Sequence, residues 1–146
     1  MSGEPEPRNA ASDVLRMNWA RLSDREFADQ TPERLDEGFT HEDRRSVVSM
    51  TPVDAGKVVD SIHMYDELSG GHPVFSIEEV LAVRGERLAL VRSRIDFPER
   101  EYATVSLQVF QYDVTVTRCQ RSIVFDLADL DAAIDALEEL AAALED

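Results

Sequence analysis

The stretch from Phe39 to Val48, FTHEDRRSVV, holds the residue best suited to move a proton. Its partly alternating pattern predicts a strand that includes Asp43. A carboxylate facing an apolar pocket has a raised pKa and can exchange a proton with a carbon beside a carbonyl group. The alternative is that Asp43 pairs with Arg44, Arg45 or another arginine and stays solvated. Asp43 is therefore expected to be either a general base or one half of an ion pair.

A second polar group lies on the predicted strand 102–112, whose residue types alternate. One face carries Gln108 among hydroxyl and aromatic side chains, and the other face is mainly aliphatic. The polar face either lines a ligand cavity or forms the outer surface at a dimer seam. By strand register we expect Arg121 on the same side as Gln108, available for an anionic ligand. The plainer interpretation of Arg121 is an internal ion pair with Asp43.

The other reactive residue types show no spacing typical of a site. His41, His63 and His72 form no metal motif. Alternation places His41 and Asp43 on one strand face, but no third ligand is indicated, so we expect surface histidines and no metal. Cys119 lies in a predicted strand without a motif partner, which favours a buried structural thiol. No hydrolase elbow or phosphate-binding glycine loop occurs, and no cofactor is expected.

Short helices are expected before these strands. Ser12 or Asp13 can cap the first helix, and residues 1–11 are expected to form a flexible tail. Ser23 and Thr31-Pro32 are start signals for further helices, and Gly38 is expected to end the last of them.

One more helix is expected between the first strand and the remaining strands. It would begin at Thr51-Pro52 and end at Ser69. Four strand candidates follow, joined by short turns that favour antiparallel neighbours: 74–83, 87–97, 102–112 and 114–125.

The segment 127–144 has the strongest helical pattern in the chain. It presents an apolar stripe beside an acidic face, formed by Leu130, Ile134, Leu137, Leu140 and Leu144. This helix is expected to pack on its own sheet, with docking of a partner as the alternative. Helices gathered against an antiparallel sheet predict one α+β domain over residues 12–146.

Composition excludes several classes of partner. The 146 residues include 15 Lys and Arg against 30 Asp and Glu, a net charge of -15. Nucleic acids and anionic membranes both attract basic proteins, so neither is expected as a partner. No apolar run approaches the ~20 residues of a membrane helix, and the start of the chain lacks a secretion signal. We therefore expect an acidic cytoplasmic protein.

The order of elements resembles the nuclear transport factor 2-like superfamily, which includes SnoaL-like polyketide cyclases and ketosteroid isomerase. The resemblance covers roughly residues 12 to 140 and is carried by FTHEDRR from Phe39, EVLAVRGERLALVR from Glu79 and VFDLADLDAA from Val124. It implies a cone-shaped, curved antiparallel sheet around a pocket, closed by the N-terminal helices, with a C-terminal helix. It also implies a homodimer.

The resemblance carries over a site as well. Asp43 matches the general base that ketosteroid isomerase holds on its first strand. The two oxyanion-hole positions correspond to Trp19 and Gln108, which donate hydrogen bonds but are not the acids of that enzyme. This departure argues against steroid-type isomerisation.

Three functions follow from these expectations. The first is a SnoaL-like domain that binds a hydrophobic or carbonyl-containing small molecule through Trp19, Asp43, Gln108 and Arg121. The second is an isomerase or cyclase acting on a carbonyl substrate, with Asp43 as its base. The third is a protein-interaction or dimerisation module. Enzymatic activity is left open.

Overall fold

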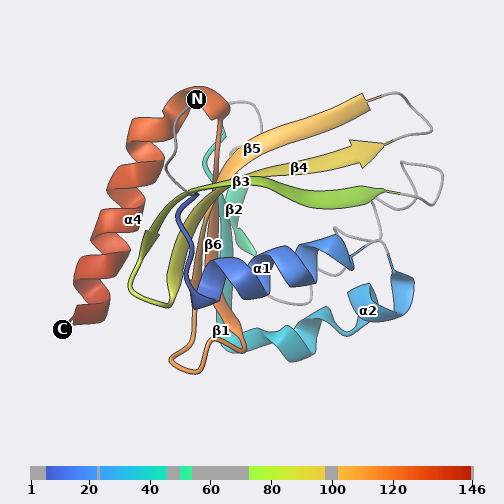
Figure 1. Ribbon diagram of the computed structural model, residues 1–146, viewed down its shortest axis with the longest axis horizontal. Coiled ribbons are helices and arrows are strands. Elements are labelled where there is room, and N and C mark those ends of the chain that lie inside the picture. The colour runs from blue at the N-terminus through green and yellow to red at the C-terminus, as the bar shows by residue number, and fades with distance from the viewer. Residues whose placement is uncertain (1–5, 23, 46–49, 54–72, 98–101, 146) are drawn as a thin grey trace.

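The structure is a computed structural model that describes residues 6–22, 24–45, 50–53, 73–97 and 102–145 (Figure 1). Its centre is a curved, open sheet of six strands in the order β2-β1-β6-β5-β4-β3. Their bounds are β1 Leu35–Asp43, β2 Met50–Val53, β3 Val74–Arg84, β4 Leu88–Phe97, β5 Tyr102–Tyr112 and β6 Cys119–Phe125.

Strands β3 to β6 form the antiparallel meander that the short turns predict. The sheet is not wholly antiparallel, because β1 pairs with β6 in parallel. This pairing brings the first strand beside the last one, so that Asp43 lies opposite Val124. The predicted α+β architecture with a curved sheet is confirmed.

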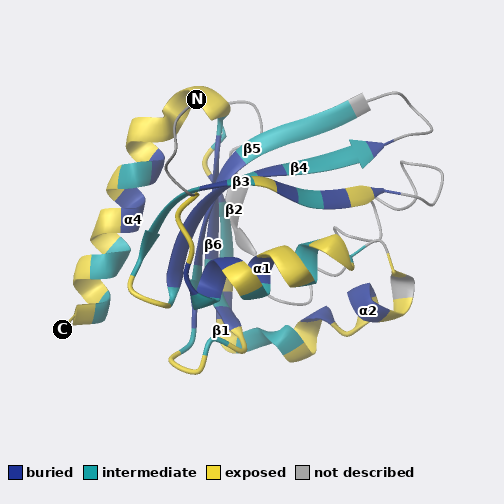
Figure 2. Ribbon diagram, viewed as in Figure 1, coloured by how far each residue is buried: buried dark blue, intermediate teal, exposed yellow. Residues whose placement is uncertain are grey.

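Helices cover the two faces of the sheet (Figure 1). We call the face under α1 (Ala10–Ala20) the inner face and the face under α4 (Leu130–Glu145) the outer face. Figure 2 shows buried residues between these layers. Buried inner-face core residues include Leu15, Phe39, Val80, Val91 and Phe110, and buried outer-face core residues include Leu90, Val109, Ile123, Phe125 and Leu137.

Helix α1 begins before the predicted cap. Asn9 is the N-cap, because its side-chain oxygen accepts from the backbone N–H of Ser12 at 2.8 Å and the Ser12 hydroxyl accepts from the Asn9 N–H at 2.9 Å. The Asn9 amide also donates to the carbonyl oxygens of Gly85 and Leu88. Asn9 is buried by these contacts. The expected flexible tail over residues 1–11 is therefore wrong for residues 9–11, which are fixed to the turn between β3 and β4.

The segment after α1 contains two short helices, α2 (Arg25–Asp29) and the 3-10 helix η1 (Thr31–Arg34). Asp24 rather than Ser23 caps α2, since its carboxylate accepts from the N–H of Phe27; Ser23 lies outside the described residues. Gly38 does not end a helix but lies within β1, which starts at Leu35 where the backbone becomes extended. The strand extends further back than predicted because Leu35 pairs with Cys119 of β6 and packs against the inner core.

The expected helix at Thr51-Pro52 is also wrong at its start, because Met50–Val53 form β2. A proline is compatible with this strand, since β2 lies at the sheet edge and needs no hydrogen bond on its outer side. Residues 54–69 of that expected helix lie outside the described residues.

The C-terminal helix packs on its own sheet, as expected. Leu137 is fully buried against the outer face, whereas Leu130 at the start of the stripe is 41% exposed. Arg84 at the end of β3 pairs with Glu138 of the helix. Within the described ranges, no helix is long and apolar enough to cross a membrane.

Substitution of Leu137 tests whether α4 belongs to the core. We expect Leu137→Ala to lower the free energy of unfolding by about 2–5 kcal/mol, because it leaves a cavity between α4 and the sheet. The same change at the half-exposed Leu130 is expected to cost under about 1 kcal/mol. Urea unfolding followed by Trp19 fluorescence measures both values. Equal, small losses in the two variants would show that α4 contributes little to the core.

Candidate functional site

The inner face carries a polar cluster whose composition depends on an irregularity in β6. Gln111 of β5 is paired with Arg121 of β6, but the next residue of β5, Tyr112, is paired with Cys119. Gln120 is therefore an extra residue in β6 without a partner position on β5. An extra residue reverses the alternation of side chains on either side of it. Cys119 accordingly packs in the inner core, whereas Ile123 packs in the outer core.

Arg121 consequently lies on the opposite side from Gln108, and the predicted placement of Arg121 is wrong. Its Cα partner on β5 is Gln111, whereas Gln108 is paired with Val124. The Nε atom of Arg121 is buried and has no hydrogen-bond partner among the described residues. The expected ion pair with Asp43 is therefore wrong too, and Arg121 does not join the inner-face cluster.

Two rows of side chains cross the inner face from β1 to β5. In the first row, His41 of β1 is paired with Ser122 of β6, which is paired with Phe110 of β5. In the second row, Asp43 is paired with Val124 and Val124 with Gln108. Paired residues in a sheet project to the same face, so both rows contribute to one surface.

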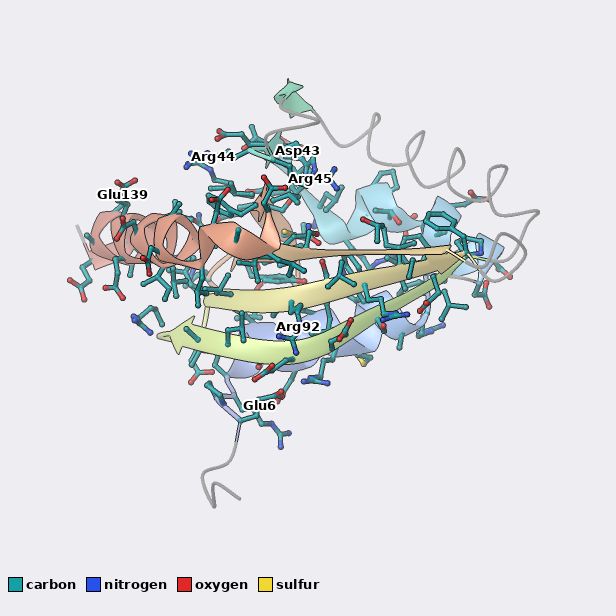
Figure 3. The ribbon with its side chains drawn as sticks, turned by 90° about the horizontal axis from the view of Figure 1, so that it is seen from above. Glu6, Asp43, Arg44, Arg45, Arg92 and Glu139 are labelled. Atoms are coloured by element: carbon teal, nitrogen blue, oxygen red, sulfur yellow. The ribbon has the colours of Figure 1, made fainter. Side chains whose placement is uncertain are left out.

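Asp43 is held in an ion pair with Arg45. Figure 3 shows the two residues together at the end of β1. The guanidinium donates from Nε to both carboxylate oxygens, at 2.9 and 3.1 Å, and from Nη2 at 2.5 Å. The backbone N–H of Arg45 adds a further bond of 3.0 Å. Burial of Asp43, which is 6% exposed, raises its pKa, but the bonds and charge of Arg45 outweigh burial and hold the pKa below its usual value.

The expected raised pKa of Asp43 is therefore wrong, because the carboxylate does not face a purely apolar environment. The sequence left Asp43 as either a general base or one half of an ion pair, and the structure contains the ion pair with Arg45. A carboxylate with a lowered pKa is a weaker base, which argues against Asp43 as the group that abstracts a proton.

His41 is the residue that sequence analysis misjudged. It lies half-buried on the inner face, and its Nδ1 atom is hydrogen-bonded to the Ser122 hydroxyl. Burial lowers the pKa of His41 below 6.5, an effect that Asp43 opposes and Arg45 reinforces. The expectation of a surface histidine is wrong here. Alternation already placed His41 on the face of Asp43, and that signal was sufficient to find it.

Gln108 and Trp19 lie on the same side of the sheet. Gln108 is 6% exposed, and its Oε1 accepts from the Ser93 hydroxyl at 2.6 Å. The Trp19 ring meets Phe75 and Phe110 edge-on, with centroids 5.8 and 6.2 Å apart. Neither the Gln108 amide nitrogen nor the Trp19 indole N–H donates to an atom of the described residues. The polar face of β5 is thus the inner face rather than the outer one.

The remaining reactive groups of the described chain fit structural roles. Burial raises the pKa of the Cys119 thiol to about 12, so the thiolate that a nucleophile requires does not form near neutral pH. No group of three or more His, Cys, Asp or Glu residues in the described ranges is arranged to hold a metal ion.

Solved structures identify the fold. No family model and no curated protein matches the sequence. A protein of unknown function with a cystatin-like fold from Methylobium petroleophilum PM1 superposes with a TM-score of 0.64, at 10% identity over 83% of this chain and 78% of that one. An NTF2-like protein of unknown function from Cytophaga hutchinsonii ATCC 33406 gives 0.55, at 8% identity over 82% and 92%.

A third similar structure is a putative isomerase of the SnoaL-like family from Agrobacterium tumefaciens C58. Its TM-score is 0.56, at 10% identity over 79% of this chain and 92% of that one. The protein therefore has the NTF2-like fold that the sequence resemblance implies. Identities this low establish the fold alone.

Removing the Arg45 side chain charge tests the origin of the lowered Asp43 pKa. In Arg45→Gln we expect the pKa of Asp43 to rise, because burial then acts without a compensating cation. Arg44→Gln is the matched control, since Arg44 pairs with Glu42 instead, and it should leave Asp43 nearly unchanged. Carbon NMR of the Asp43 carboxyl group during a pH titration measures this pKa in the natural chain and in both variants.

The same substitution reverses the pH dependence of stability. The lowered pKa stabilises the native protein above the unfolded pKa of about 3.9, and this contribution is lost as the pH falls through the folded value. With a raised pKa, Asp43 would instead destabilise the protein as the pH rises. An unchanged Asp43 titration in Arg45→Gln would contradict the assigned cause.

Proposed function

We propose that the protein binds a carbonyl-containing small molecule against the inner face of its sheet. The observation that carries this proposal is a pair of hydrogen-bond donors, Gln108 Nε2 and Trp19 Nε1, that have no partner among the described residues. A ligand oxygen that accepts hydrogen bonds from these two donors would be held and oriented by them.

The surroundings of these donors favour a ligand with an apolar body. The edge-on contacts of Trp19 with Phe75 and Phe110 form an aromatic wall beside the polar rows. Small-molecule sites combine mainly apolar walls with a few placed polar groups. Donors next to aromatic rings suit a ketone or a related carbonyl compound better than an anion, because Arg45, the cation next to the second row, is already bonded to Asp43.

The candidate ligand-binding residues are Trp19, Gln108 and Asp43, with Asp43 and Arg45 acting as a fixed charged pair. Arg121, which the sequence analysis included, is left out because it lies on the outer face. The SnoaL-like putative isomerase shares the fold, and on that analogy the bound carbonyl compound is a substrate or product of isomerisation. Formation of a homodimer and a cytoplasmic location stay predictions.

Binding of simple ketones tests this proposal. We use cyclohexenone and acetophenone as probes, with cyclohexene and ethylbenzene as partners that lack the carbonyl oxygen. Both ketones should shift the NMR signal of the Gln108 side-chain amide and change the emission of Trp19, the only tryptophan in the chain. The hydrocarbons should bind more weakly by about tenfold or more, because they leave the donors unpaired.

Two leucine substitutions separate the inner face from the outer one. Gln108→Leu should weaken ketone binding by about tenfold, which corresponds to the loss of one hydrogen bond of about 1.4 kcal/mol. Gln111→Leu, the same change on the opposite face of β5, should leave affinity unchanged. Equal affinities in the two variants, or equal binding of ketones and hydrocarbons, would refute the proposed site.

A further inference from the structure

We propose that Arg121 and Thr40 bind a small carboxylate anion on the outer face of the sheet. The site lies where β6 runs between β1 and β5, because Arg121 is paired in the sheet with Thr40 on one side and with Gln111 on the other. Gln108 of the proposed ketone site lies on the opposite face of β5 from Gln111. The anion site is therefore separate from the ketone site and does not depend on it.

The guanidinium group of Arg121 has no acceptor in the described part of the chain. Its Nε atom is buried and unbonded, and none of its nitrogen atoms forms a hydrogen bond or an ion pair with the described residues. A guanidinium stays charged in proteins, so a buried nitrogen of this group without a partner costs free energy. An ordered water or an ion usually accounts for such an atom in a native structure, and the positive charge favours an anion.

The neighbouring strands do not supply the missing counter-charge. On β1, the Glu42 carboxylate is paired with Arg44. The Asp36 carboxylate of the same strand accepts a hydrogen bond from Gln120 at 3.2 Å. On the other side, β5 contains no acid, and its Gln111 donates to Gln120 Oε1 at 2.7 Å. These side chains satisfy one another and leave the guanidinium without an anionic partner.

Arg121 lies at the border of the apolar layer under α4. Ile123, the next residue of β6 on this face, is fully buried in the outer core, and so is Leu88, which is paired with Gln111. An arginine at such a border buries its aliphatic stem and keeps part of its head accessible, in agreement with its half-buried side chain. The low polarity of the layer strengthens the attraction between the guanidinium and an anion, compared with a fully exposed arginine.

The groups at this site suit a carboxylate. The planar fork of a guanidinium matches the two oxygens of a carboxylate and binds both at once. Thr40 is exposed, and its hydroxyl, which has no partner among the described residues, can donate a further hydrogen bond. The site offers one cation, and the acid Glu42 lies two residues along β1 from Thr40. A singly charged anion is therefore favoured over a doubly charged phosphate.

Acetate titration tests the proposal, with acetamide as the uncharged counterpart and inorganic phosphate as the doubly charged anion. Nitrogen NMR follows the Nε–H signal of Arg121, and the backbone amide signal of Thr40 reports binding in every variant. Acetate should shift both signals in the natural chain, and acetamide should shift neither. Arg121→Gln should weaken acetate binding by about tenfold or more, because a charge-assisted hydrogen bond is lost. Tighter binding of phosphate than of acetate would overturn the assignment of a carboxylate.

Arg118→Gln is the matched control, because Arg118 lies exposed in the turn before β6 and its loss changes the net charge equally. This variant should keep the acetate affinity within about twofold of the natural value. Equal weakening in Arg118→Gln and Arg121→Gln would show that net charge governs binding, and would refute the site.

If Arg121→Gln does not fold, the natural chain decides. An Nε–H signal of Arg121 that responds to acetate and not to acetamide supports the site, and a signal that responds to neither refutes it. A signal that changes with protein concentration and not with acetate would show that a second copy of the chain supplies the acceptor, which also refutes a small-molecule site.

Discussion

One extra residue in β6 determines which side chains meet on the inner face of this protein. Gln120 interrupts the pairing of β5 with β6, and the strand resumes its alternation with Ser122 and Val124 turned inward. Ser122 thereby reaches His41 across the parallel β1–β6 pair, and Val124 separates Asp43 from Gln108. Without that residue, the segment from 121 to 125 would present the opposite set of side chains to each face.

The layers around the sheet hold this register in place. On the outer face, Ile123 and Phe125 pack with Leu137 of α4, so a shift of β6 would expose a buried core. On the inner face, Asn9 fixes the start of α1 to the turn between β3 and β4, which holds Trp19 over Phe110. The apolar packing thus places Ser122, His41 and Gln108 on one surface. There the bonds of His41 with Ser122 and of Gln108 with Ser93 replace hydrogen bonds to water.

The sequence predicts those parts of the fold that depend on periodicity. The strands from Val74 to Tyr112 and the apolar stripe of the last helix follow from alternation and 3.6-residue spacing. Helix starts are less well predicted, because Asn9 and Asp24 each cap a helix near other residues with the same capping ability. Thr51-Pro52 has a helix-start pattern but lies in edge strand β2, where tertiary pairing overrides local preference.

The sequence predicts the site only as far as the extra residue Gln120 in β6. Asp43 and Gln108 lie on one face because the register from β1 through β6 to β5 is regular at their positions. The prediction for Arg121 is wrong because of the one extra residue, which has no glycine or proline to mark it in the sequence.

The most direct measurement is nitrogen NMR of the His41 ring. We expect a His41 pKa below 6.5 that changes in Ser122→Ala; a ring that titrates at or above 6.5, unaffected by that substitution, would contradict the placement of His41 on the buried inner face.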